Sequence, residues 1–112
     1  MDQVDPAVWG DKVAQADVWR AHSPLSLADK LAGVGLYLSY GNGDPGPLDD
    51  TDAEHDDLEA RFAVENERFV ARLKELGIPA TVDAYGPGTH SWRYWDRELP
   101  KALPMLLQAL GA

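Results

Sequence analysis

Residues 34–43 read VGLYLSYGNG, and this stretch decides the fold. Its first seven residues are mostly aliphatic or aromatic and are followed by Gly41, Asn42 and Gly43, so they predict a β-strand over residues 34–40. A nearly continuous apolar run is typical of a strand buried on both faces, as in a parallel sheet. The Gly-, Pro- and Asp-rich residues 41–53 predict a loop at the carboxyl end of this strand.

A long amphipathic helix is predicted next, over residues 53–76. Its apolar residues recur at spacings of 4, 7, 4 and 3, which places them on one helix face. They are Leu58, Phe62, Phe69, Leu73 and Leu76. Gly77 ends the helix, and residues 80–85 predict a second strand that stops at the Gly-Pro-Gly of residues 86–88.

Further helices are predicted on either side of this unit. Ser23 and Pro24 suit the cap and the first position of a helix that ends near Ala32, and residues 6–20 suggest one or two short helical turns. Residues 92–110 have a helical pattern but include Pro100 and Pro104, so we expect a kinked or split helix there.

Strands that alternate with helices indicate an α/β fold with a parallel sheet. Two parallel strands alone would leave their edges open and their faces uncovered, which makes a poor independent sheet. Residues 1–112 are therefore interpreted as a partial domain, the C-terminal portion of a larger α/β sheet.

Charge and composition narrow the possible functions. The 112 residues include 10 basic and 19 acidic ones, a net charge of −9, which argues against nucleic-acid and anionic-lipid partners. The absence of cysteine excludes disulfides, thiolate metal sites and a cysteine nucleophile. No apolar run approaches the roughly 20 residues of a membrane span, and the acidic residues 1–12 do not have the apolar region of a signal peptide. The compartment stays undetermined.

His90 is the residue that most strongly suggests chemistry. It lies in a Gly-Pro-Gly-Thr-His loop directly after the second predicted strand. Functional groups in open parallel sheets gather in the loops at the carboxyl ends of the strands. A neutral imidazole held there can act as a general base, although a loop histidine is also a common surface residue.

The residues around His90 resemble a known family. The stretch GPGTHSWRYW, residues 86–95, followed by Leu99, is similar to the end of the bacterial esterase family that includes the antigen 85 mycolyltransferases. The Tyr-Gly-Asn-Gly of residues 40–43 is a second match, and Leu58-Glu59 with Asn66 and Phe69 is a third. The resemblance covers residues 33–112, and actinobacterial members are similar over residues 7–32 as well.

This resemblance implies an α/β-hydrolase three-layer sandwich and a serine carboxylesterase or acyltransferase with a Ser-Glu-His triad. His90 falls at the position of the general base, and Glu59 at that of the acid. Asp44 or Asp49 would instead be the acid if it directly followed the strand, and Glu59 near a helix start is also favoured by the helix dipole alone. Trp92 would bind substrate beside His90, or else anchor the last helix.

The serine nucleophile is missing from the chain. No Gly-x-Ser-x-Gly motif occurs, and the only serines are Ser23, Ser26, Ser39 and Ser91. The chain would then be the part of an acyl-serine enzyme that supplies the histidine and the acid, inactive alone. Whether it is itself an enzyme stays open, and the alternative is a catalytically inactive binding or interaction domain derived from the same fold.

The predicted partners follow from this interpretation. They are a small-molecule or lipid ester bound by the full-length enzyme, and the missing N-terminal part of the same fold. No cofactor is expected. No metal is expected either, because the acidic residues 49–57 do not have the glycine and the carboxylate spacing of a calcium-binding EF-hand.

Overall fold

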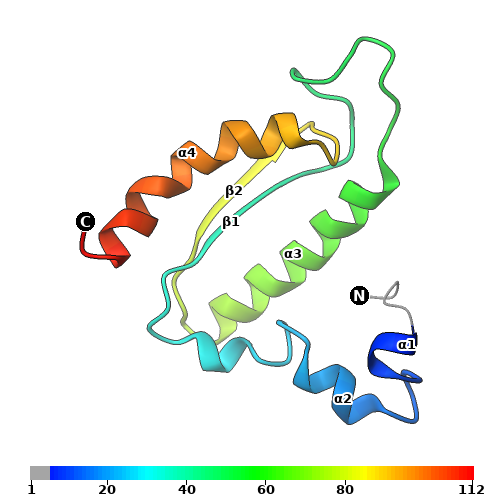
Figure 1. The fold of residues 1–112 in the computed structure, drawn as a ribbon, viewed down its shortest axis with the longest axis vertical. Coiled ribbons are helices and arrows are strands. Elements are labelled where there is room, and N and C mark those ends of the chain that lie inside the picture. The colour runs from blue at the N-terminus through cyan, green and yellow to red at the C-terminus, as the bar shows by residue number, and fades with distance from the viewer. Residues whose placement is uncertain (1–5) are drawn as a thin grey trace.

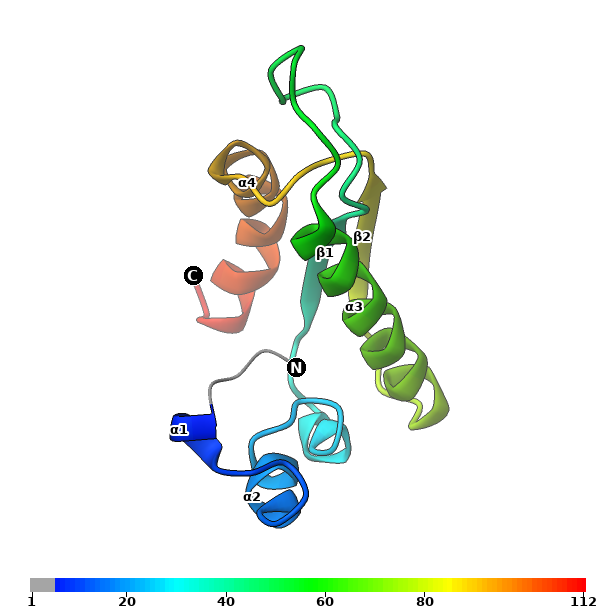
Figure 2. The ribbon, with the colours of Figure 1, turned by 90° about the vertical axis from the view of Figure 1, so that its right-hand side faces the viewer.

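A computed structural model describes residues 6–112. Residues 1–5, which belong to the N-terminal stretch predicted not to be a signal peptide, lie outside the described residues. The two strands form one small sheet, with helices α3 and α4 on its opposite faces (Figures 1 and 2). The elements in chain order are α1 (Pro6–Trp9), α2 (Ala16–Ala21), the 3-10 helix η1 (Ala28–Leu31), β1 (Tyr37–Gly41), α3 (Asp57–Glu75), β2 (Thr81–Gly86) and α4 (Trp92–Ala109). The predicted alternation of strands and helices is confirmed.

The two strands pair in parallel, and α3 forms the crossover between them. Tyr37 lies opposite Thr81, and the register is irregular between Tyr40 and Gly41. The ladder starts later than the predicted strand at residue 34, because Pro79 has no N–H and the Thr81 N–H makes the first bond, 2.9 Å long, to the Leu36 carbonyl. In β1, only Tyr40 and Gly41 are buried and the other residues are half-buried, so the predicted burial on both faces is realised only in part; no residue of β2 is buried.

The helix predicted to start at Ser23 and Pro24 and end near Ala32 is wrong. Turns cover residues 24–27, and only Ala28–Leu31 form a single 3-10 turn. A segment this short is a marginal α-helix. The Ser23 hydroxyl accepts the Ser26 N–H at 3.3 Å, which is the predicted cap contact, but the turn that it starts does not continue as an α-helix.

The long helices also differ from the prediction at particular residues. α3 starts at Asp57 rather than near residue 53, because the Asp56 side chain caps the helix from an extended backbone. α4 is one helix that runs through Pro100 and Pro104, so the predicted split is wrong. Both prolines are exposed, which lets water reach the carbonyl groups that they leave without a helical donor.

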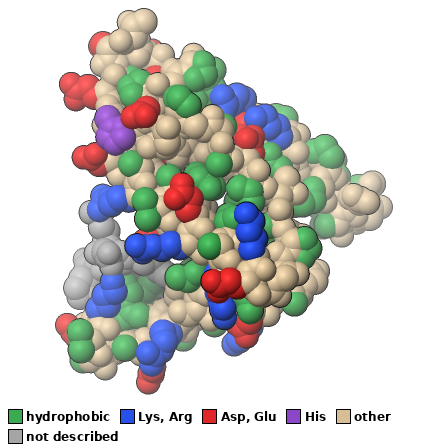
Figure 3. All heavy atoms as spheres, turned by 180° about the vertical axis from the view of Figure 1, so that it is seen from behind, with side chains coloured by type: hydrophobic (Ala, Val, Ile, Leu, Met, Phe, Trp, Pro, Cys, Tyr) green, Lys and Arg blue, Asp and Glu red, His purple; other side chains and the backbone are tan. Residues whose placement is uncertain are grey.

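The hydrophobic core lies where α3 and η1 meet the start of the sheet. Ala28, Leu73 and Ile78 are buried there. Other apolar side chains remain exposed among charged ones on the face shown in Figure 3, and α4 exposes several leucines. The exposed leucines of α4 are Leu99, Leu103, Leu106, Leu107 and Leu110. Within residues 6–112, no helix has the length and hydropathy needed to cross a bilayer.

Leu73 is the residue whose truncation tests this core. Its side chain is only 1% exposed, so Leu73→Ala is expected to lower the free energy of unfolding by about 2–5 kcal/mol. Val64→Ala on the exposed side of the same helix should stay within about 0.5 kcal/mol of wild type. Urea unfolding followed by tryptophan fluorescence measures both, and equal effects would contradict a core centred on Leu73.

Candidate active site

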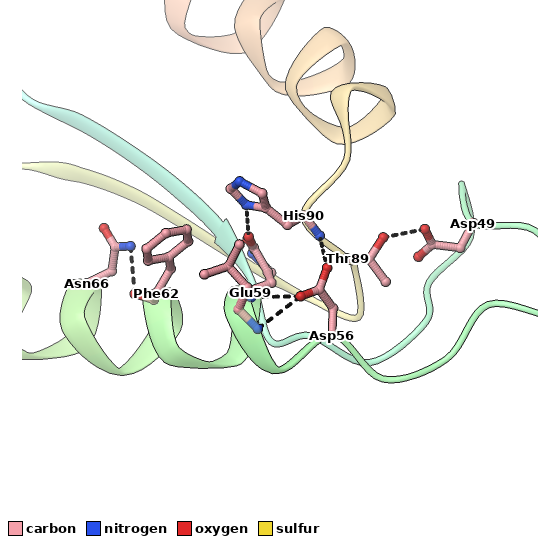
Figure 4. Close-up of polar contacts among 9 residues, drawn as sticks. Asp49, Asp56, Glu59, Phe62, Asn66, Thr89 and His90 are labelled. Carbon is pink, nitrogen blue, oxygen red and sulfur yellow. Dashed lines mark hydrogen bonds and ion pairs between the residues drawn. The ribbon is translucent and has the colours of Figure 1, made fainter. Parts of the chain in front are cut away.

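His90 and Glu59 meet at the carboxyl edge of the sheet (Figure 4). Glu59 lies in the first turn of α3 and His90 in the loop after β2, and His90 Nδ1 is 2.8 Å from Glu59 Oε2. The other Glu59 oxygen accepts the Gly41 backbone N–H at 2.9 Å. Because a carboxylate accepts at Nδ1, that nitrogen carries the proton and Nε2 has the free lone pair.

The surroundings fix the orientation of both side chains. Glu59 is 4% exposed, whereas the His90 side chain is 32% exposed. The imidazole lies between two aromatic rings, with ring-centre distances of 5.2 Å to Phe62 of α3 and 4.8 Å to Trp95 of α4. Its second nitrogen points away from Glu59 (Figure 4). Glu59 therefore holds His90 Nδ1, and His90 Nε2 is left pointing away from it as the basic nitrogen.

Asp56 is a third carboxylate at this site, and it was not predicted from the sequence. Its Oδ2 accepts the His90 backbone N–H at 2.9 Å, while Oδ1 accepts the N–H groups of Leu58 at 3.0 Å and Glu59 at 3.2 Å. The hydrogen bond from His90 is the main reason that the pKa of Asp56 is lowered below its ordinary value. The sequence signal that could have indicated Asp56 is its position three residues before Glu59, the spacing of a helix capping box.

Glycines let the two loops of this edge approach closely. The Gly43 N–H donates to the Gly88 carbonyl at 3.0 Å, and the Gly43 carbonyl accepts the Asp56 N–H at 2.7 Å. Gly43 has a φ of 91°, and a Cβ there would lie 2.4 Å from the Asp56 carbonyl oxygen. Only glycine fits this position, which explains why the Tyr-Gly-Asn-Gly stretch accompanies the histidine loop.

The two alternative acids lie elsewhere. Asp44 Oδ1 is 2.9 Å from His55 Nδ1, not near His90. Asp49 accepts the Thr89 hydroxyl at 2.5 Å and the Tyr94 hydroxyl at 2.7 Å. Asp49 therefore links the loop after β1 to Thr89, the residue before His90. Of the three candidate acids Asp44, Asp49 and Glu59, only Glu59 contacts the imidazole.

The remaining candidates are placed as follows. Trp92 is 75% exposed and touches the edge of Trp95 at 4.7 Å between ring centres, so it does not anchor α4 to the sheet. Ser91 caps α4 by accepting the Arg93 N–H. Within residues 6–112, no serine hydroxyl hydrogen-bonds to His90, and no group of three or more His, Asp or Glu side chains could hold a metal ion.

A parallel strand–helix–strand unit, with helices on both faces and a histidine–carboxylate pair at the strand ends, is typical of enzymes with an α/β-hydrolase-like fold. The family model described as "Putative esterase" matches residues 3–106, and the chain belongs to this esterase family.

Curated relatives agree with this assignment. The chain is 29% identical to the diacylglycerol acyltransferase/mycolyltransferase Ag85B of Mycolicibacterium smegmatis over 107 residues, which are 93% of this chain and 33% of that protein. It is 32% identical to Ag85A of Mycobacterium tuberculosis over 108 residues, 94% of this chain and 31% of the relative. The chain thus spans about a third of the length of these relatives, and the resemblance to the antigen 85 family is confirmed.

Acid stability tests the loop contacts of Asp49. Burial alone would raise its pKa, but hydrogen bonds from Thr89, Tyr94 and Gly46 outweigh burial and lower the pKa below the ordinary 3.8. These bonds therefore stabilise the folded chain fully above the unfolded-state pKa, and their contribution is lost as the pH falls through the lowered folded-state pKa.

We expect Asp49→Asn to destabilise the chain at pH 7 by about 1–3 kcal/mol and to flatten the fall in stability below about pH 4. Urea midpoints between pH 2.5 and 7 measure this. Asp52→Asn in the same loop, an exposed residue, is the matched control. A pH profile of Asp49→Asn that runs parallel to that of wild type would contradict the role of these bonds.

Proposed function

We propose that this chain supplies the histidine and the acid of the catalytic triad of a serine esterase or acyltransferase. The observation that carries the proposal is the 2.8 Å contact between His90 Nδ1 and a nearly fully buried Glu59, whose second oxygen is held by the Gly41 N–H. The relatives named as diacylglycerol acyltransferases and mycolyltransferases support transfer of an acyl group to an alcohol.

In the proposed reaction, a serine hydroxyl outside this chain gives its proton to His90 Nε2 and attacks the ester carbonyl carbon. The tetrahedral oxyanion collapses, and the imidazolium returns the proton to the leaving alkoxide, which leaves an acyl-serine. Water or an acceptor alcohol then loses its proton to Nε2 and attacks the acyl carbonyl. The serine recovers its proton as the C–O bond of the acyl-serine breaks. Glu59 stays ionised throughout and stabilises the imidazolium.

Trp92 is proposed to contact the substrate. Its ring lies on the edge of Trp95, which itself packs on the His90 imidazole, and it is largely exposed. An exposed indole two residues from the proposed base offers apolar surface to an acyl chain or a leaving group.

The remainder of the esterase fold is the proposed partner. β1 pairs only with β2 among the described strands, so its other edge is open. A cavity of about 430 Å³ runs between this strand and α4, with Leu36 and Ser39 on one wall and Leu99 on the other. Glu98 also lines the cavity; it is 3% exposed, and its Oε1 accepts no hydrogen bond from the described residues. A strand added in parallel at this edge would cover the apolar wall, and a donor beside it would satisfy Glu98.

A second candidate function is a binding domain without catalysis. It is favoured by the finding that, within residues 6–112, no serine hydroxyl contacts His90. In a binding domain, His90 and Glu59 would have only a structural role. The two candidate functions therefore differ in whether a substitution of His90 lowers catalysis.

A chimera tests the catalytic proposal. Residues 1–112 would replace the matching third of Mycolicibacterium smegmatis Ag85B, whose remaining two thirds would supply the serine. We expect hydrolysis of p-nitrophenyl butyrate and labelling by a fluorophosphonate, with His90→Ala and Glu59→Gln each lowering turnover by about 10³-fold or more. Asp44→Asn, whose carboxylate pairs with His55, should change turnover by less than about twofold.

The isolated chain gives an independent test, because it should show neither turnover nor label. A labelled serine in the isolated chain would refute the proposal that the nucleophile lies outside it. Full activity of the His90→Ala chimera would refute the role of His90 and favour the binding domain.

A further inference from the structure

One carboxylate, that of Asp56, hydrogen-bonds to the backbone of both members of the proposed pair. Its Oδ2 is 2.9 Å from the His90 nitrogen, and its Oδ1 is 3.2 Å from the Glu59 nitrogen (Figure 4). His90 and Glu59 also touch through their side chains at 2.8 Å. The three residues therefore form a closed ring of hydrogen bonds, although His90 lies 34 residues after Asp56 in the sequence.

Asp56 is itself held in place. Its backbone N–H donates to the Gly43 carbonyl at 2.7 Å, and the Gly43 N–H donates to the Gly88 carbonyl at 3.0 Å. The loops that follow β1 and β2 and the start of α3 thus converge on this residue. The aromatic contacts of Phe62 and Trp95 restrict the imidazole ring, but the backbone N–H of His90 is fixed by Asp56.

We propose that Asp56 is a positioning residue of the active site, which sets the distance and the angle between His90 and Glu59 through the backbone of both. This inference rests on the proposed function for its catalytic meaning, but the geometry that it predicts concerns the chain alone. The charged groups recorded against His90 are Glu59 and Asp56, both at the start of α3, whereas α4 contributes the uncharged Trp95. Two carboxylates therefore hold His90, Glu59 at the ring and Asp56 at the backbone N–H.

The chemistry of Asp56 allows a substitution that separates its two tasks. Asparagine caps helices about as well as aspartate, but it has one acceptor oxygen instead of two. In Asp56→Asn, the single side-chain oxygen can cap α3, and the side-chain NH2 then faces the His90 N–H. Two donors cannot form a hydrogen bond with each other, so the contact to His90 is lost. Asp56→Ser caps as well, with a side chain too short to reach His90. Both variants keep the helix start and release His90.

Asp57→Asn is the matched control. It removes the same charge one residue further along, from an exposed side chain at the same helix end. That side chain contacts His55 at 3.5 Å. Asp56→Asn and Asp57→Asn therefore share any effect of lost charge or of the helix dipole. Only Asp56→Asn also loses the acceptor of the His90 N–H.

NMR on the isotope-labelled 112-residue chain measures the result. In wild type we expect a slowly exchanging His90 amide and a single imidazole tautomer with the proton on Nδ1. Asp56→Asn and Asp56→Ser should speed exchange of the His90 amide by about tenfold or more and mix the tautomers, while Asp57→Asn leaves both as in wild type. Equal His90 exchange and tautomer ratio in Asp56→Asn, Asp57→Asn and wild type would overturn the inference.

The chimera separates this inference from the proposed function. We expect Asp56→Asn to lower kcat about 10–100-fold with little change in KM. If the chimera is inactive while the NMR changes occur, the catalytic proposal fails and the positioning of His90 by Asp56 stands. If His90→Ala abolishes activity but Asp56→Asn changes neither kcat nor the His90 amide, the positioning role alone is refuted.

Discussion

The parallel pairing of β1 with β2 is the constraint on which the rest of the structure depends. Parallel neighbours require a crossover, and here α3 runs back along the sheet to provide it. The start of α3 therefore lies at the same edge as the ends of both strands. Glu59 in the first turn of α3 and His90 just after β2 meet because of this topology, and not because their sequence separation is short.

The carboxyl edge of the sheet and its open sides are built differently. At the carboxyl edge, glycines let two loops touch through their backbones, and Asp49, Asp56 and Glu59 each accept several hydrogen bonds from this chain. Along α4, several leucines are exposed, and the buried Glu98, although its Oε2 pairs with Arg97 and Lys101, has no hydrogen-bond donor at Oε1 among the described residues. A chain whose site carboxylates are well hydrogen-bonded and whose apolar surfaces are open agrees with its match to a third of the length of its relatives.

The alternation of strands and helices could be predicted from the sequence because apolar periodicity is a local signal. His90 and Glu59 were indicated as a pair only by the family resemblance, with Asp44 and Asp49 as alternative acids, and the distance between them depends on the fold. Other features depend on contacts between distant residues. The start of the ladder depends on Pro79, which has no N–H to extend the ladder before the bond from Thr81 to Leu36. The continuity of α4 depends on the exposure of its prolines. Asp56 was missed because it stands in a run of acidic residues with no local mark of its contact with His90, 34 residues away.

The burial of Glu59 bears directly on the catalytic proposal. A carboxylate this far from water is costly unless hydrogen bonds replace its hydration, and the Gly41 N–H and the His90 ring do so in the resting chain. When His90 takes a proton, the same oxygen faces an imidazolium, and the hydrogen bond becomes an ion pair without any movement of Glu59. The stabilisation grows as positive charge develops, so it acts on the transition state more than on the resting state. In the proposed triad, this chain builds that electrostatic arrangement from its own residues, and the serine would come from elsewhere.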